Sequence, residues 1–257
     1  MKTRIPPVLI IFALICFALV QNTQAVSPPP PGGYPNFTTA AGDHALQALT
    51  SGLGNTALGT FSLFSVTTGS FNTAVGAGAL DLNTADSNTA TGAAALLFNT
   101  TGTENTANGT AALELNQTGS QNTANGAFAL FNNTIGGFNT AVGDRALFSN
   151  TEGETNSAFG WSALASNTTG VANTAVGVGA LFSNATGESN TATGNNALQS
   201  NTIGHDNTAT GVGALFSNTT GIQNTANGAD ALSSNTDGAA NTAALAQYHR
   251  QLQHSLR

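Results

Sequence analysis

The stretches N-T-A-V-G-A-G-A-L at residues 72–80 and N-T-A-V-G-V-G-A-L at residues 173–181 are two copies of the motif that decides the fold. Each belongs to a 17-residue unit with the consensus N-T-A-x-G-x-x-A-L-F-S-N-T-T-G-x-x, numbered here from position 1, the asparagine. A fixed period of this length is typical of solenoids, in which each unit buries its apolar side against its neighbours. The units start at Thr38, Asn55, Asn72, Asn88, Asn105, Asn122, Asn139, Asn156, Asn173, Asn190, Asn207 and Asn224, and a truncated unit starts at Asn241.

Variation among the units separates inner positions from outer ones. Position 3 is Ala, position 5 is Gly and position 9 is Leu in all twelve units, and no charged residue falls at positions 1 to 5, 8 or 9. One interval has 16 residues, between Asn72 and Asn88, and Asp86 is expected to take the place of its glycine. A stacked coil requires such a partition, because a narrow interior excludes charge.

The motif is expected to form a strand over N-T-A-x-G, because alternate residues of an extended segment share one face. A second strand is expected through A-L-x-x. The N-T-T-G stretch is expected to turn the chain, with its glycine at positive φ and its asparagine bonding local backbone. The sequence therefore predicts an all-β fold, a parallel β-solenoid or β-roll of about twelve 17-residue coils over residues 38–242.

Two side-chain ladders are predicted within the coils. Asparagines stacked coil upon coil can bond one another, as identical amides do in stacked β structures. The structural core ladder is the leucine of position 9: Leu46, Leu63, Leu80, Leu96, Leu113, Leu130, Leu147, Leu164, Leu181, Leu198, Leu215 and Leu232. The turn ladder is the asparagine of position 12: Asn83, Asn99, Asn116, Asn133, Asn150, Asn167, Asn184, Asn201, Asn218 and Asn235.

A helical alternative has to be weighed, since seventeen residues also suit two short helices. Glycine at positions 5 and 15 costs about 1 kcal/mol each against alanine inside a helix. Because nearly every unit carries both glycines, the penalty falls on every helix that the repeat allows, and the β interpretation is preferred.

The first residues of the chain predict export. Lys2 and Arg4 precede an unbroken apolar run over residues 8–20, so residues 1–25 are interpreted as a cleaved secretory signal peptide. The run is shorter than the roughly 20 residues of a membrane-spanning helix, which argues against an anchor. Cys16 is the single cysteine, so the mature chain is predicted to hold no disulfide and no cysteine-based metal site.

Two further segments flank the repeat. Residues 26–37 contain four consecutive prolines and predict an extended linker. Residues 243–257 have helical spacing, no glycine and basic residues near their end, and predict a short C-terminal helix or cap.

Association between chains is also predicted. Each coil buries one leucine and a few alanines, which offsets only part of the entropy lost in ordering seventeen residues. A homo-oligomer is therefore expected. Phenylalanines occur at position 10 (Phe64, Phe131, Phe148, Phe182, Phe216) and position 17 (Phe71, Phe138). They either extend each coil's own core, form a seam between subunits, or form an exposed adhesive stripe.

The motif N-T-A-V-G-x-x-A-L resembles the head repeats of YadA-like trimeric autotransporter adhesins, which carry an N-S-x-A-x-G core in a left-handed parallel β-roll. The longer form of the unit is similar to repeat arrays in bacterial surface proteins and phage tail-fibre-like proteins. The resemblance covers residues 38–242, and it implies a trimeric rod, display on a bacterial cell surface, and adhesion to a host, matrix or cell-surface ligand. The unit departs from the adhesin pattern in its length of 17 residues and in N-T-A for N-S-x-A.

No chemistry-bearing motif is recognised, so no catalytic, metal or cofactor-binding residue is nominated and the chain is predicted not to be an enzyme. His205-Asp206 is the best candidate metal pair, and a solvated turn explains it better. Only 7% of residues are charged, with 12 acids against 5 basic residues. Such a surface repels nucleic acid and anionic lipid, so neither is expected as a partner, and no membrane insertion is expected after signal cleavage.

The sequence thus predicts an exported cell-surface or extracellular structural or adhesive repeat rod. One alternative is an ice-binding solenoid, because Thr recurs at position 2 in all but one unit, although position 4 varies from Thr to Phe to Asn. Another alternative is a fragment of a longer tail-fibre-like protein. Thermal hysteresis distinguishes the first alternative, and the downstream reading frame distinguishes the second.

Overall fold

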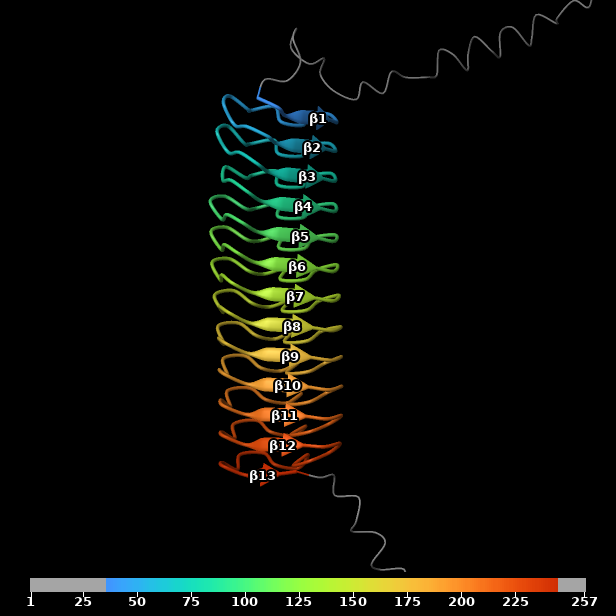
Figure 1. Cartoon of the computed structure of the whole chain (residues 1–257), viewed down its shortest axis with the longest axis vertical. Helices are drawn as coiled ribbons and strands as arrows, with labels where there is room; N and C mark the ends of the chain where they lie inside the picture. Colours follow the sequence, from blue (N-terminus) through green and yellow to red (C-terminus); the bar gives the residue numbers. More distant parts are fainter. Residues whose placement is uncertain (1–35, 245–257) are drawn as a thin grey trace, which may run out of the picture.

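The computed structural model describes residues 36–244, and each repeat unit within them contributes one short strand (Figure 1). All strands pair in parallel and in chain order, forming a single 13-stranded sheet. The predicted all-β parallel solenoid is confirmed. The strands are β1 (Thr39–Ala41), β2 (Thr56–Leu58), β3 (Thr73–Val75), β4 (Thr89–Thr91), β5 (Thr106–Asn108), β6 (Thr123–Asn125), β7 (Thr140–Val142), β8 (Ser157–Phe159), β9 (Thr174–Val176), β10 (Thr191–Thr193), β11 (Thr208–Thr210), β12 (Thr225–Asn227) and β13 (Thr242–Ala243).

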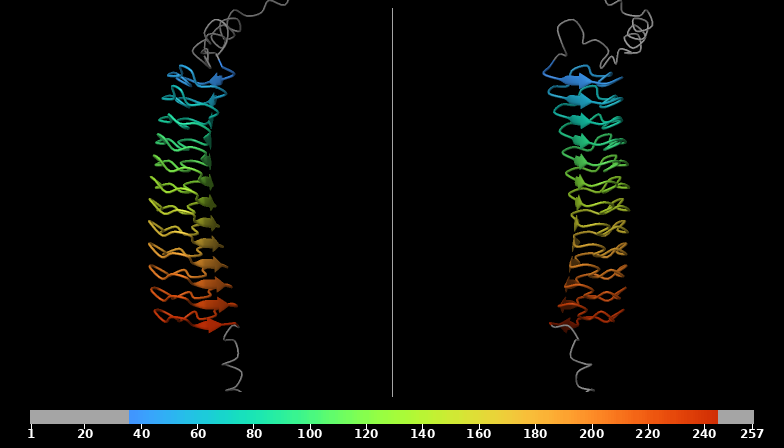
Figure 2. Two further views of the ribbon diagram at one scale, coloured as in Figure 1. Left: turned by 60° about the vertical axis from the view of Figure 1, so that its left-hand side comes forward. Right: turned by 90° about the vertical axis from the view of Figure 1, so that its right-hand side faces the viewer.

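The coils stack in strict register along a gently curved rod (Figure 2). Each strand covers positions 2 to 4, so the threonine of one coil pairs with the threonine of the next, as Thr106 does with Thr123. β13 carries the stack to Ala243, one residue into the segment predicted as a C-terminal helix or cap. Residues 245–257 of that segment, the predicted signal peptide and most of the predicted linker lie outside the described residues.

The 16-residue unit keeps the strand register, because its deletion falls in a turn. Thr73 of β3 still pairs with Thr89 of β4. The prediction that Asp86 replaces the glycine is wrong. The carbonyl of Ala85 accepts hydrogen bonds from the side chains of Asn72 and Asn83, which is what the glycine carbonyl does in the other coils.

The core is the predicted leucine ladder together with the alanines of positions 3 and 8. Leucines from Leu63 to Leu215 are fully buried, Leu46 is 5% exposed, and Leu232 in the last full coil is partly buried. The ladder thus lines a continuous apolar interior, closed in the middle of the rod and more open at its ends.

The second strand predicted through A-L-x-x does not form. The leucine of position 9 has a positive φ in every coil, as at Leu147 with φ 52°. Position 7 is left-handed as well, for example Arg145 with φ 55°. Left-handed residues two apart bend the backbone continuously, so this segment is a succession of turns that still bonds to the next coil, from Leu63 N to the carbonyl of Ala79 at 3.0 Å.

The two glycines of the unit are needed for different reasons than predicted. Position 5 takes the strongly positive φ, 142° at Gly126, where a Cβ would also lie 2.5 Å from the Gly143 oxygen. Position 15, expected to be left-handed, is absent from the positive-φ residues of the described chain. At Gly136 a Cβ would overlap the carbonyl oxygen of Gly153 in the next coil, so close stacking requires this glycine.

Candidate functional site

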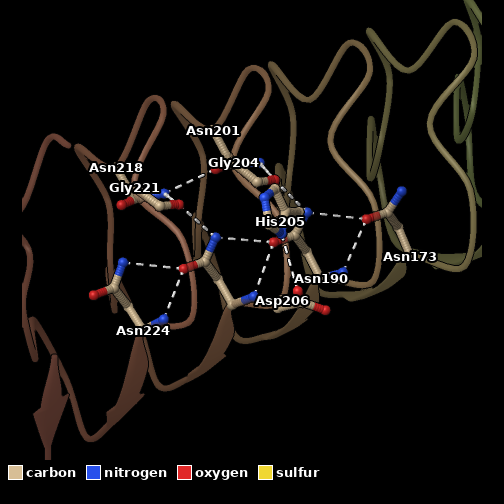
Figure 3. Close-up of polar contacts among 10 residues, drawn as sticks. Asn173, Asn190, Asn201, Gly204, His205, Asp206, Asn218, Gly221 and Asn224 are labelled. Atoms are coloured by element: carbon tan, nitrogen blue, oxygen red, sulfur yellow. Dashed lines mark hydrogen bonds and ion pairs between the residues drawn. The ribbon is translucent and has the colours of Figure 1, made fainter. Parts of the chain in front are cut away.

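The predicted asparagine ladder at position 12 forms as a chain of side-chain amides, and Figure 3 shows its step from Asn218 to Asn201. Asn218 Nδ2 donates to Asn201 Oδ1 at 2.8 Å, and Asn201 Nδ2 donates to the carbonyl of Gly204 at 2.9 Å. The same pair of bonds recurs in the nine position-12 asparagines from Asn99 to Asn235, and all but the last of these nine side chains have no exposed surface. The first ladder is therefore buried and saturated.

A second ladder, formed by the asparagine of position 1, was not predicted. Asn207 donates to Asn190 Oδ1 from its backbone N at 3.1 Å and from Nδ2 at 3.0 Å, and its Nδ2 also donates to Gly221 O at 2.8 Å. Equivalent bonds to the preceding coil run from Asn72 to Asn241, with the single exception of Asn88 Nδ2. Asn88 Nδ2 donates to Asn83 Oδ1 instead.

The two ladders meet at the glycine of position 15. The carbonyl of Gly204 accepts from Asn190 Nδ2 at 2.7 Å and from Asn201 Nδ2 at 2.9 Å, so both asparagines of a coil converge on one oxygen. Asn at position 1 of every unit after the first was the available signal. The sequence placed that asparagine on the inner face but gave no distance between neighbouring coils.

Threonines form two parallel ranks with opposite roles. At position 13 the hydroxyl is used internally, as where Thr151 Oγ1 donates to the carbonyl of Thr168 at 3.1 Å. The rank at position 2, called the sheet-face rank, is exposed or half-buried, and its hydroxyls make no hydrogen bond within residues 36–244. The sheet-face rank consists of Thr39, Thr56, Thr73, Thr89, Thr106, Thr123, Thr140, Ser157, Thr174, Thr191, Thr208, Thr225 and Thr242. This rank is free to contact a ligand.

The phenylalanines of position 10 lie outside the leucine and alanine core. Phe182 is 37% exposed and Phe216 is 38% exposed, and none of the position-10 rings belongs to the buried cluster. Rings pack against rings of position 7 in their own coil, with centroids 5.8 Å apart for Phe128 and Phe131. Positions 7 and 10 therefore form one aromatic-rich surface, called the outer stripe below, and the expectation that these rings extend the core is not supported.

Titratable groups are scattered along the rod. His205 Nδ1 lies 2.9 Å from Asp206 Oδ2 in an exposed turn, and within residues 36–244 no three His, Cys, Asp or Glu side chains gather as a metal site. Burial raises the pKa of the Asp81 and Glu114 carboxyls, both at position 10. Asp81 Oδ1 is buried without a hydrogen-bond partner.

No protein-family model, curated protein or solved structure matches this chain. The likeness to YadA-like head repeats rests on the repeat motif alone. Over residues 36–244 the chain has no helix of the length and apolarity needed to span a bilayer.

Proposed function

We propose that the chain is an exported structural or adhesive rod, displayed on a bacterial cell surface or released outside the cell, that acts without a catalytic centre. Side-by-side association of rods, as the trimer that the resemblance implies or as a pair, is part of this proposal. A host, matrix or cell-surface component is the proposed ligand.

One observation carries the proposal. The residues that the coils repeat form the buried leucine ladder and the two asparagine ladders. The positions that vary, such as 4 and 6, are exposed or half-buried. A molecule built in this way keeps its length and stiffness while its surface changes, which suits a spacer or an adhesin better than an enzyme.

Adhesion is tested with beads that carry residues 26–257 and are presented to cells and to extracellular matrix. We expect retention that falls gradually when residues 122–155, two whole units, are deleted, because binding would be distributed along the rod. The beads are compared with beads that carry the unfolded chain. Equal retention of both bead types would contradict the adhesive role.

Export is tested separately, by fusing residues 1–25 to a reporter that is active only outside the cytoplasm. Reporter activity and cleavage after Ala25 are expected. An inactive, uncleaved fusion would contradict the proposed location while leaving the rod architecture intact.

Ice binding is a second candidate, favoured by the in-register sheet-face rank with its free hydroxyls. Exposed Leu58 and Phe159 at position 4 interrupt a flat hydroxyl surface beside it. If ice is the ligand, Thr123→Tyr in mid-rank abolishes thermal hysteresis and Ile135→Tyr in an exposed turn does not. Absence of hysteresis in the unmodified chain eliminates this candidate.

A further inference from the structure

The outer stripe runs along nearly the whole rod, and the residues along it are arranged nearly symmetrically about its midpoint. The coils are numbered 1 to 12. The residues of position 10 in coil k and in coil 13 − k are either both polar or both apolar, with one exception. The pairs are Gln47 with Ser233, Phe64 with Phe216, Asp81 with Gln199, Leu97 with Phe182, Glu114 with Ala165 (the exception), and Phe131 with Phe148.

This order has a geometric meaning. A two-fold axis perpendicular to the rod, between coils 6 and 7, exchanges coil k with coil 13 − k. When such an axis lies in the plane between two facing rods, position 10 of one copy meets position 10 of the other, and position 7 meets position 7. The symmetry of the stripe is the symmetry that an antiparallel pair of rods requires.

The midpoint of the stripe holds three phenylalanines from two adjacent coils. The rings of Phe131 and Phe148 are stacked with centroids 5.3 Å apart and planes 5° apart, and Phe128 packs edge-on against Phe131. The two-fold axis brings these stacked rings against the same rings of a second copy. Large aromatic side chains at the centre of an interface carry most of the binding free energy in protein complexes.

The same two-fold rotation brings residues of position 7 in one copy opposite residues of position 7 in the other. Phe61, 41% exposed, falls opposite Gly213, and the Asp230 carboxylate of the next coil lies over that glycine. His44, whose ring stacks on Phe61 of its own chain with centroids 4.9 Å apart, falls opposite Asp230. Arg145, whose guanidinium already lies 5.7 Å from the Phe128 ring in its own chain, falls opposite the Phe128 of the partner.

A second copy fits the stripe better than an unrelated protein does. Apolar groups recur along the stripe in steps of the coil spacing, about 4.8 Å, so full contact requires a partner with the same axial repeat. Twelve coils and a stripe about 11 Å wide give roughly 1,200 Å² of total buried surface, the lower end of the range for specific interfaces. A parallel pair would instead set each half-buried Asp81 against another Asp81.

We propose that two copies of this chain associate antiparallel through the outer stripe, with the stacked pair Phe131 and Phe148 at the centre of the interface. This inference rests on the homo-oligomer part of the proposed function and specifies its face, its symmetry and its number of chains.

Cross-linking distinguishes the arrangements, because the single cysteine of the chain is Cys16 and residues 26–257 contain none. Asp81→Cys and Gln199→Cys variants of residues 26–257 are treated with a short bis-maleimide, alone and after mixing. The antiparallel pair predicts covalent dimers in the mixture and none with either variant alone. Covalent dimers in each variant alone, or trimers by sedimentation, would overturn the antiparallel pair and leave the homo-oligomer.

Two controls complete the design. A mixture of Thr89→Cys and Thr174→Cys, from the sheet-face rank of coils 4 and 9, is expected to give no cross-link. Phe148→Glu should weaken the dimer by about 100-fold or more with unchanged circular dichroism, whereas Phe159→Glu on the sheet face should leave it intact. A monomer at micromolar concentration in the unmodified chain would overturn both the pair and the homo-oligomer.

Discussion

Position 12 distinguishes the first two coils from the ten that follow. Leu49 and Val66 occupy it in the first two coils, and asparagine occupies it in all the others. Position 1, whose asparagine donates to the same position-15 carbonyl, is asparagine in every full coil after the first. The rod thus tolerates an apolar residue in one ladder and keeps asparagine throughout the other.

The bonds of the two ladders explain this difference. A position-1 asparagine such as Asn139 bonds the preceding coil through both its backbone N and its Nδ2, and its Oδ1 accepts from the backbone N and Nδ2 of Asn156. The side chain of a position-12 asparagine such as Asn150 bonds only other asparagine side chains and the Gly153 carbonyl, and that carbonyl also accepts from Asn139. Removing the second kind therefore orphans fewer buried groups.

The largest expected effect comes from breaking the position-1 ladder in mid-rod. Asn139→Ala leaves the backbone N and Nδ2 of Asn156 without their acceptor and opens a small cavity. We expect the free energy of unfolding to fall by about 3–5 kcal/mol. Urea titration followed by circular dichroism measures the change. Thr140→Ala, which removes an exposed hydroxyl without an internal partner, is the matched control and should stay within about 0.5 kcal/mol.

Breaking the position-12 ladder in the same coil should cost less. Asn150→Val orphans one proton of Asn167 Nδ2 and one acceptor site of Asn133 Oδ1, and the Gly153 carbonyl keeps its bond from Asn139. The expected loss is about 1–2 kcal/mol in the same titration. A loss equal to that of Asn139→Ala would show that the two ladders do not differ in the way described.

Extending the position-12 ladder by one coil, to Val66, sharpens the comparison. Val66 is fully buried, and a buried valine replaced by asparagine ordinarily destabilises a protein by several kcal/mol. Here the new amide meets the Gly69 carbonyl and the Nδ2 of Asn83, so Val66→Asn should stay within about 1 kcal/mol of the parent. Val66→Asp, which lacks the amide donor, is the control and should destabilise the rod markedly.

The smallest effect is expected on the outer stripe, where the Asp81 carboxyl is only partly buried. Desolvation raises the pKa of Asp81 in the folded rod, so the folded state binds this proton more tightly than the unfolded chain does. Stability should therefore rise as the pH falls from 7 through the raised pKa, and be lost again as the pH rises. Asp81→Asn should shift the Tm by less than about 2 °C and flatten its dependence on pH. The opposite result would be a Tm of the unmodified chain that falls steadily from pH 7 to pH 5, and by more than the Tm of the Asp81→Asn variant. That result would contradict this prediction.

The sequence was sufficient for the architecture, because every residue that stacks is repeated at a fixed interval. Period, register, the buried leucines and the position-12 asparagines all follow from that repetition. The missing second strand was not predictable in the same way. Leu147 and its equivalents hold a left-handed conformation that leucine does not favour by itself, and it is imposed by the stacking of neighbouring coils.

The contacts between coils were also beyond prediction. The role of glycine at position 15 depends on the approach of the next coil's carbonyl, as at Gly136. The position-1 ladder depends on the distance between neighbouring amides, and the outer stripe depends on which side chains face outward. Each of these is a property of two coils together, which a single repeat does not contain.

Distances along the rod test the stacked-coil account most directly. Spin labels at Thr60 and Val178, and at Thr60 and Val212, mark position 6 of coils seven and nine repeats apart, in protein diluted with unlabelled chain. Pulsed electron–electron resonance should give about 34 Å and about 43 Å, a difference of two coil spacings for thirty-four residues. Distances that do not increase in proportion to the number of coils would contradict it.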